Sequence, residues 1–294
     1  MKKIIIAIVF IFSIQFVSAC DICGCSTGNY FVGPFPRFHK HFFGTRYTFR
    51  SFRSEVANDP TQFSKDFYQT VELWGGWNIG KKWQLLAFLP YNFNKQHSDD
   101  TLLKSNGFGD ATIMTNYNIF SNRNGFTSSE LWFGGGIKLP VGKFAADPNA
   151  IVASANNQAG TGSYDFLLNA LYVLRMREWS INSNINYKLN GSKNAYKFGD
   201  RLSTNIFISR IVGTKFASFS PNIGLLFEHL NANELSNTKV ASTGGNGLLT
   251  AVGTEVNFGK IIVGTNVQLP ISQNLSDGQT TTKVRGMLHL SYAF

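Results

Sequence analysis

The residues of this chain that could do chemistry are charged side chains, spaced along segments in which polar and apolar residues alternate. Arg46, Arg50 and Glu72 share the polar parity of two neighbouring segments. If the long loop between these segments closes Ser54 against Asp66, Thr48 lies opposite Glu72, and the carboxylate is diagonal to both arginines. We therefore predict an ion-pair network on one face of a sheet. The same face carries further candidates, which a polar interior would solvate without any specific role: Glu130, Lys138, Glu178, Lys188, Glu228, Glu255, Arg285 and His289.

Four aspartates stand where the chain returns from a long connection: Asp66, Asp110, Asp165 and Asp200. By parity the first three lie on the polar face, whereas Asp200 lies on the apolar face with Leu202. An acidic ring at one end of the sheet would favour cations and repel anions. Aspartate also caps backbone N–H groups in turns, and we favour that structural role.

The three cysteines form one short motif, Cys20-Asp-Ile-Cys23-Gly-Cys25. Cys20 follows Val-Ser-Ala, which fits the box that precedes a lipid-modified cysteine. Clustered thiolates also suit a soft metal ion, and a disulfide could form in an oxidising compartment. An odd number of cysteines leaves one thiol over unless lipid or metal takes it. His39 and His41 lie within reach along the chain, but no motif has zinc spacing, and no other cofactor is predicted.

An enzyme and a nucleic-acid-binding protein are both poorly supported. No Gly-x-Ser-x-Gly is present, and His289 has no obvious serine and acid partners. The formal net charge is +10, but no run of basic residues forms a stripe for nucleic acid. We therefore expect no catalytic residues and no nucleic-acid partner.

A period of two dominates the chain after about residue 41 and predicts β-strands. From Glu178 to Asn190, large apolar residues fall on one parity while Ser, Asn and Lys fall on the other. One face therefore suits lipid and the other suits water. We predict twelve strands: Phe42–Phe52, Phe67–Ile79, Lys82–Phe93, Asp110–Phe120, Glu130–Leu139, Asp165–Leu174, Glu178–Asn190, Arg201–Ile211, Ala217–Leu230, Leu248–Phe258, Lys260–Leu269 and Val284–Phe294.

The connections between these strands alternate short and long, which favours a membrane barrel over a soluble sandwich. Residues 80–81 and Gly259 are tight turns, whereas 94–109, 140–164 and 231–247 are long. Outer-membrane barrels have short periplasmic turns and long outer loops, with aromatic residues at the membrane interfaces. We therefore predict an all-β, antiparallel transmembrane barrel in a bacterial outer membrane, with its amino terminus in the periplasm. The connection 140–164 is long enough to fold inward as a constriction or to cover the mouth.

The amino terminus has the three parts of a secretory signal peptide. A cationic head, Met1 to Lys3, precedes an apolar run from Ile4 to Val17 and a small-residue cleavage site. The apolar run is shorter than the roughly 20 residues that a spanning helix needs. We therefore divide the chain into a signal peptide (1–19), a periplasmic cysteine-containing segment (20–40) and a barrel (41–294).

The last predicted strand carries an assembly signal. Its apolar residues share one parity and end on the terminal aromatic residue of the sequence: Leu288, Leu290, Tyr292 and Phe294. This pattern resembles the carboxy-terminal signal that barrel-assembly machinery reads. We expect the lipid bilayer and this machinery to be partners of the chain.

Several loose motifs of turn residues recur through the predicted barrel. They are Leu89-Pro90-Tyr91-Asn92, Gly107-Phe108-Gly109-Asp110, residues 134–142, residues 161–165 and Phe198-Gly199-Asp200. In these the chain resembles the bacterial outer-membrane transporter family named after the phenol meta-cleavage pathway, which is related to fatty-acid-transporter-like barrels. The resemblance implies a porin-like channel or facilitator for small molecules, including hydrophobic or aromatic ones. We keep one alternative, a structural or metal-handling outer-membrane lipoprotein whose barrel anchors the cysteine segment.

Overall fold

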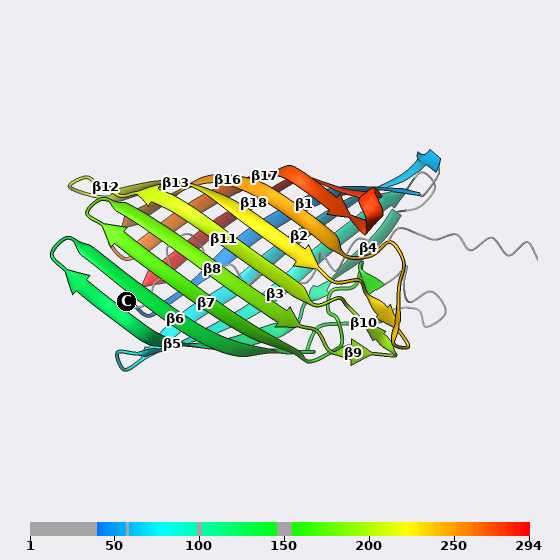
Figure 1. Cartoon of the computed structure of the whole chain (residues 1–294), viewed down its shortest axis with the longest axis horizontal. Helices are drawn as coiled ribbons and strands as arrows, with labels where there is room; N and C mark the ends of the chain where they lie inside the picture. The colour runs from blue at the N-terminus through cyan, green and yellow to red at the C-terminus, as the bar shows by residue number, and fades with distance from the viewer. Residues whose placement is uncertain (1–39, 57–58, 99–101, 146–154) are drawn as a thin grey trace, which may run out of the picture.

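The computed structural model describes residues 40–56, 59–98, 102–145 and 155–294, which form a closed antiparallel β-barrel (Figure 1). Twelve long strands pair in chain order, and the last pairs with the first. Strand pairing around the whole circumference leaves no open sheet edge. The strands are β1 (Phe42–Val56), β2 (Asp59–Ile79), β3 (Trp83–Ser98), β5 (Ala111–Asn124), β6 (Thr127–Leu139), β7 (Asp165–Met176), β8 (Trp179–Leu189), β11 (Arg201–Arg210), β13 (Ser218–Leu230), β16 (Gly245–Phe258), β17 (Ile261–Leu275) and β18 (Thr280–Ala293).

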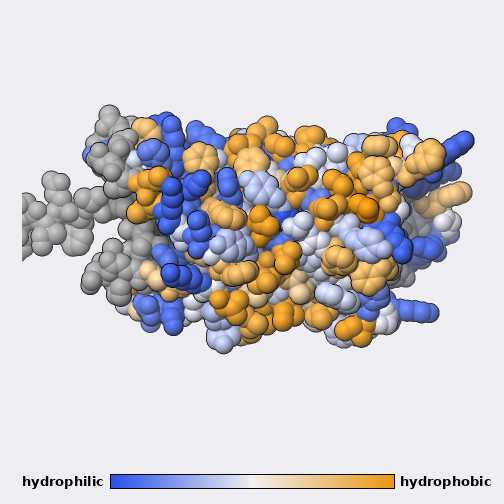
Figure 2. Space-filling model, turned by 180° about the vertical axis from the view of Figure 1, so that it is seen from behind, coloured by the Kyte–Doolittle hydropathy of each residue, from blue (hydrophilic) through white to orange (hydrophobic). Residues whose placement is uncertain are grey.

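The twelve predicted strands are therefore confirmed, because each has one counterpart in the barrel. Alternation along each strand sorts side chains between the interior, which we call the lumen, and the outer wall. In β7, for example, Phe166 is 58% exposed and Leu167 is 3% exposed. On the face that Figure 2 shows, apolar side chains are spread over the middle of the outer wall, and hydrophilic side chains gather toward both ends. Within the described ranges, no helix is long and apolar enough to cross a membrane.

Tight turns join the strands at one end, which we call the short-turn end. Gly80, Gly125 and Gly259 take φ values of 66°, 56° and 65° in these turns, a conformation that glycine adopts without strain. The amide of Phe294 donates a hydrogen bond to the His41 carbonyl over 2.9 Å. The carboxyl terminus and the start of β1 therefore meet at the short-turn end.

The opposite end, which we call the long-loop end, contains more regular structure than the sequence predicts. Residues 94–109, predicted as a loop, extend β3 and add β4 (Leu102–Phe108), which pairs with β3. The connections after β8 and β13 also form a small four-stranded sheet. Its strands are β9 (Ser192–Lys193), β10 (Tyr196–Lys197), β14 (Glu234–Leu235) and β15 (Thr238–Lys239), while β12 (Val212–Gly213) pairs with β13 at the short-turn end.

The register of β1 against β2 differs from the prediction. Thr48 lies opposite Thr70, and Arg46 rather than Thr48 lies opposite Glu72. The pairing continues outward to Ser54 opposite Ser64, so both strands run further than the alternation alone indicates. The predicted register was wrong by two residues because it assumed a longer loop between β1 and β2.

One ladder of the barrel is interrupted. β17 and β18 pair from Ile261 to Gln268 on β17, and pairing resumes only at Leu275, past Pro270. Proline has no N–H to give to a ladder. In the gap the Gln273 side chain bonds both backbone groups of Thr282, accepting from its N–H over 2.7 Å and donating to its carbonyl over 3.1 Å. A short 3-10 turn, η1 (Ser276–Gly278), then leads into β18.

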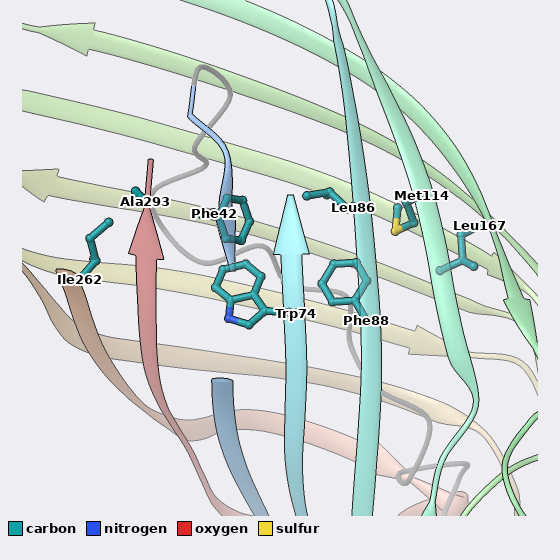
Figure 3. Close-up of a cluster of buried hydrophobic side chains, with 8 residues drawn as sticks. All are labelled: Phe42, Trp74, Leu86, Phe88, Met114, Leu167, Ile262 and Ala293. Atoms are coloured by element: carbon teal, nitrogen blue, oxygen red, sulfur yellow. The ribbon is translucent and has the colours of Figure 1, made fainter. Parts of the chain in front are cut away.

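Part of the inner wall is apolar, which the sequence pattern does not predict. Eight buried side chains line it on β1, β2, β3, β5, β7, β17 and β18: Phe42, Trp74, Leu86, Phe88, Met114, Leu167, Ile262 and Ala293 (Figure 3). Phe42 packs edge-on against Trp74, and Trp74 stacks on Phe88. The lumen therefore has an apolar sector around β1 to β3.

Candidate functional site

The first charged group of the lumen joins β1 and β2. Arg46 and Glu72 form a buried ion pair, so the predicted contact between them exists, directly across the ladder rather than diagonally. The Arg46 guanidinium also lies 5.2 Å from the Trp74 ring centroid. Arg50 is half-buried, opposite Tyr68 on one side and Arg285 on the other.

A second group lies across β11, β13 and β18. The Glu228 carboxylate accepts from Arg201 over 3.0 Å and from Arg285 over 2.9 Å, and all three side chains are buried. Further along β16 and β18, His289 lies 3.5 Å from Glu255. Arg201 was not among the predicted site residues, although its parity with Ser203 and Asn205 could have identified it.

The third and largest group joins β6, β7 and β8 at the long-loop end. Lys138 lies 2.9 Å from an oxygen of Asp110 and 2.6 Å from an oxygen of Asp165. Lys188 lies 3.2 Å from the same Asp165 oxygen. Lys138 also donates to the hydroxyl of Thr161, and all of these side chains are buried. Two lysines and two aspartates thus form one closed network.

Asp110 and Asp165 bind the backbone of the long loops, as their predicted structural role requires. Asp110 accepts from the amides of Gly142 over 3.0 Å and Thr161 over 2.8 Å. Asp165 accepts from the amide of Gly191 over 3.1 Å. These carboxylates hold loops in place, and lysines neutralise them. They therefore do not form a ring of free acids.

The other two aspartates are placed differently. Asp66 is fully buried, accepts from the Ser64 hydroxyl over 3.2 Å, and lies well inside β2 rather than at its start. Asp200 is half-buried, accepts from the amide of Asn190 over 2.9 Å and pairs with Lys197 over 3.5 Å. The four aspartates therefore do not share one environment.

The end of the connection 140–164 lies inside the barrel mouth. Asn92 donates to the Ala159 carbonyl over 2.7 Å, and Asn94 donates to the Gln158 carbonyl over 3.0 Å. Both asparagines are inward-facing residues of β3, and the loop residues Ala155, Ala159 and Thr161 are buried. The described part of this loop therefore folds inward, as one of the two predicted alternatives requires.

At the short-turn end, a cavity of about 650 Å³ is lined by His41, Asn78, Lys81, Lys82 and Asn118 among others. The amide of Asn78 donates to His41 Nδ1 over 3.2 Å, which fixes the ring at the rim of the lumen. Lys81 and Lys82 make the lining of this cavity cationic.

Two other residues predicted to face the lumen, Glu130 and Glu178, lie in different environments. Glu130 is half-buried and accepts from the Trp132 indole over 3.0 Å. Glu178 was predicted to face inward, but it lies exposed in the β7–β8 turn and pairs with Arg210 over 2.9 Å. This prediction was wrong because the strand starts one residue later, at Trp179. Residues 1–39, with the predicted signal peptide and the three cysteines, lie outside the described residues.

The last strand presents its two parities as predicted. Leu288, Leu290, Tyr292 and Phe294 are all on the outer wall, whereas Ala293 is buried. The aromatic rings of Tyr292 and Phe294 stack with centroids 6.3 Å apart. The geometry of the proposed assembly signal is therefore present, while its recognition stays a prediction.

A barrel of this architecture is found among solved structures. The barrel is similar to the crystal structure of an outer-membrane channel from Pseudomonas putida F1, with a TM-score of 0.65 and 14% sequence identity. The match covers 87% of this chain and 96% of that channel. The chain has the fold of an outer-membrane β-barrel.

More distant similarities involve other outer-membrane proteins. The translocator domain of the autotransporter NalP from Neisseria meningitidis matches with a TM-score of 0.45 and 11% identity, covering 87% of this chain and 88% of that one. No protein-family model matches the chain, and no curated protein matches its sequence. The resemblance to the phenol meta-cleavage family therefore stays a prediction.

Proposed function

We propose that this protein is a channel of the bacterial outer membrane through which small solutes cross by way of the barrel lumen. The observation that carries the proposal is a closed barrel with opposite chemistry on its two faces. Its outer wall has an apolar band, and its lumen holds charged and amide side chains contributed by strands around the circumference. Such a wall requires lipid around it, and such an interior suits water-borne solutes.

The proposed orientation places the short-turn end in the periplasm and the long-loop end outside the cell. Barrels of this class have short periplasmic turns and longer outer loops. The start of β1 and the carboxyl terminus meet at the short-turn end, so both would lie on the periplasmic side.

The path through the lumen is narrow, and the charged groups that line it give it only a weak preference for ions. The pair Arg46–Glu72 and the four-residue network around Lys138 are each formally neutral. Twelve strands lie between the eight that enclose only side chains and the sixteen or more of open porins. Inward side chains and the loop segment around Ala159 narrow the path further. Solutes that pass are therefore small, and the apolar sector around Trp74 would accommodate their hydrophobic or aromatic parts.

Conductance of the purified barrel in planar bilayers, together with swelling of protein-containing liposomes, tests this proposal. We expect small, discrete current steps and faster swelling in small solutes than in large ones. Correct folding is checked independently, because a folded barrel resists detergent and migrates differently on a gel before and after boiling. A correctly folded barrel that conducts nothing and admits no solute would refute the channel, and would favour a barrel that anchors the cysteine segment.

A further inference from the structure

Amide side chains line the lumen on several strands, and three of these strands, β5, β7 and β17, also carry residues of the apolar sector. Seven buried asparagines face inward from β5, β7, β8, β11, β13 and β17: Asn116, Asn169, Asn182, Asn184, Asn205, Asn222 and Asn266. We call this group the amide belt. β11, near its centre, is six strands away from β2 in either direction around the barrel, so the belt faces the aromatic residues Trp74 and Phe88.

Most amides of the belt have hydrogen-bonding atoms without a protein partner. Neither the oxygen nor the nitrogen of Asn116 and Asn169 is bonded, and Asn222 Oδ1 and Asn266 Nδ2 are also unmatched. The other atoms of the last two are used within their own strands: Asn222 donates to the Ser220 carbonyl, and Asn266 accepts from Gln268. Buried polar groups are normally satisfied, so these inward-facing amides offer donors and acceptors that a polar guest could bind.

Glycine lets two of these amides approach one another. Asn116, Gly134 and Asn169 lie side by side on β5, β6 and β7. A Cβ added at Gly134 would lie 2.0 Å from Asn116 Oδ1 and 2.3 Å from Asn169 Oδ1. The two amides therefore occupy the space over Gly134, and only glycine permits this approach.

A second pair of amides lies on the other side of the belt. Asn222, Gly253 and Asn266 lie side by side on β13, β16 and β17. A Cβ at Gly253 would lie 2.3 Å from the Thr265 carbonyl oxygen and 3.1 Å from Asn222 Oδ1. Two pairs of asparagines, each on either side of a glycine, thus occur at separate places in one lumen.

The chemistry of the belt selects among solutes. An amide offers a donor and an acceptor without charge, and a hydroxyl group needs both. The carboxylates of Glu72, Glu228, Asp110 and Asp165 are each paired with a basic residue, so a cationic solute finds no unpaired carboxylate in these groups; only the Glu228 group, with two arginines, keeps one excess positive charge. The facing aromatic residues offer a surface for an apolar ring face, as binding sites for small organic molecules commonly do.

We propose that the amide belt binds uncharged, hydroxyl-rich ring compounds, and that neutral sugars are the solute class of this channel. The inference rests on the proposed channel function and deepens it, because it replaces a general preference for small hydrophobic molecules with a named chemistry. Binding inside the lumen makes uptake saturable, whereas passage through a plain water-filled pore rises in proportion to concentration.

The test is concentration-dependent uptake of D-glucose into liposomes that contain the barrel, compared with D-glucuronate, which differs by one carboxylate. We expect glucose uptake to saturate and glucuronate uptake to be slower without saturation. Replacing Asn222 and Asn266 together by Leu removes the amides at similar volume and should raise the half-saturating glucose concentration about tenfold, since each lost hydrogen bond weakens binding several-fold. Thr115→Val is the matched control, since Thr115 is the neighbour of Asn116 on the outer wall.

The outcomes separate the two proposals. If glucose uptake is linear with concentration, if glucuronate saturates equally well, or if the double variant behaves as Thr115→Val does, the amide belt is not a sugar site. If the Leu variant fails to fold, Asn222→Ser with Asn266→Ser replaces it. If the folded wild-type barrel admits no solute at all, the channel proposal fails. Calorimetric titration of glucose into the detergent-solubilised barrel then tests sugar binding at the amide belt separately. Heat of binding that the Asn variants abolish supports the site, and no heat overturns it.

Discussion

Removing the charge of Lys138 should destabilise the barrel. Its ammonium lies within 2.9 Å of oxygens of both Asp110 and Asp165, with 2% of the side chain exposed. Replacing it by Met keeps the length of the side chain and removes the charge. Breaking a buried ion pair by removing one partner typically costs about 3–5 kcal/mol, because it leaves an unmatched buried charge.

The structure places Lys138→Met near the lower end of that range. Asp165 keeps Lys188 at 3.2 Å, and Asp110 keeps the amides of Gly142 and Thr161 as donors. We therefore expect a loss of about 3 kcal/mol in the free energy of unfolding. Equilibrium urea unfolding of the barrel in lipid vesicles, followed by tryptophan fluorescence, measures it.

Two further variants make the prediction specific. Lys215→Met removes a charge from an exposed turn and should change stability by less than about 0.5 kcal/mol. Adding Asp110→Asn to Lys138→Met removes the carboxylate left unmatched and should restore about 1 kcal/mol, as coupled neighbours do. If Lys138→Met unfolds at the same urea concentration as Lys215→Met, or if the second substitution destabilises further, the network does not hold the long-loop end together.

Three other predictions concern permeation and assembly. Arg46→Ala with Arg50→Ala should shift ion selectivity toward cations, measured as the reversal potential in a salt gradient, because two positive charges leave the lumen; an unchanged potential would contradict it. Deleting residues 147–159 removes the segment that Asn92 binds and should raise single-channel conductance, and equal conductance would show that this loop does not constrict the path. Deleting Phe294 should reduce insertion into membranes more than changing the inward-facing Ala293, as counted by heat-modifiable protein in membrane fractions, and equal losses would refute the terminal signal.

The period-two alternation was enough to predict all twelve strands, because lipid outside and polar groups inside impose it on every strand. It did not fix the register of β1 against β2, since the same alternation continues beyond the lipid and hides where the loop begins. β4 was missed for a related reason: Leu102-Leu103-Lys104 breaks the alternation, and its pairing with β3 comes from backbone hydrogen bonds.

Apart from the contact between Arg46 and Glu72, the site was predicted as separate residues rather than as groups. Parity correctly placed Lys138, Asp165 and Lys188 on the inner face, but the contact between the two lysines and one carboxylate depends on the pairing of β6, β7 and β8. The apolar residues of the lumen were missed because alternation shows only that the two faces of a strand differ. It does not show that apolar residues such as Trp74 and Phe88 lie on the inner face.

The interrupted ladder between β17 and β18 has a consequence for hydrogen exchange. Backbone amides in a regular ladder are protected by a neighbouring strand, and they exchange only when the strands separate. The amide of Thr282 is protected by the side chain of Gln273 instead, through a bond of 2.7 Å. A rotation of one side chain is enough to expose it, on a timescale far shorter than strand separation. The barrel therefore has a point on its wall where protection depends on a rotamer, and a single residue, Gln273, sets how fast solvent deuterium enters the chain there.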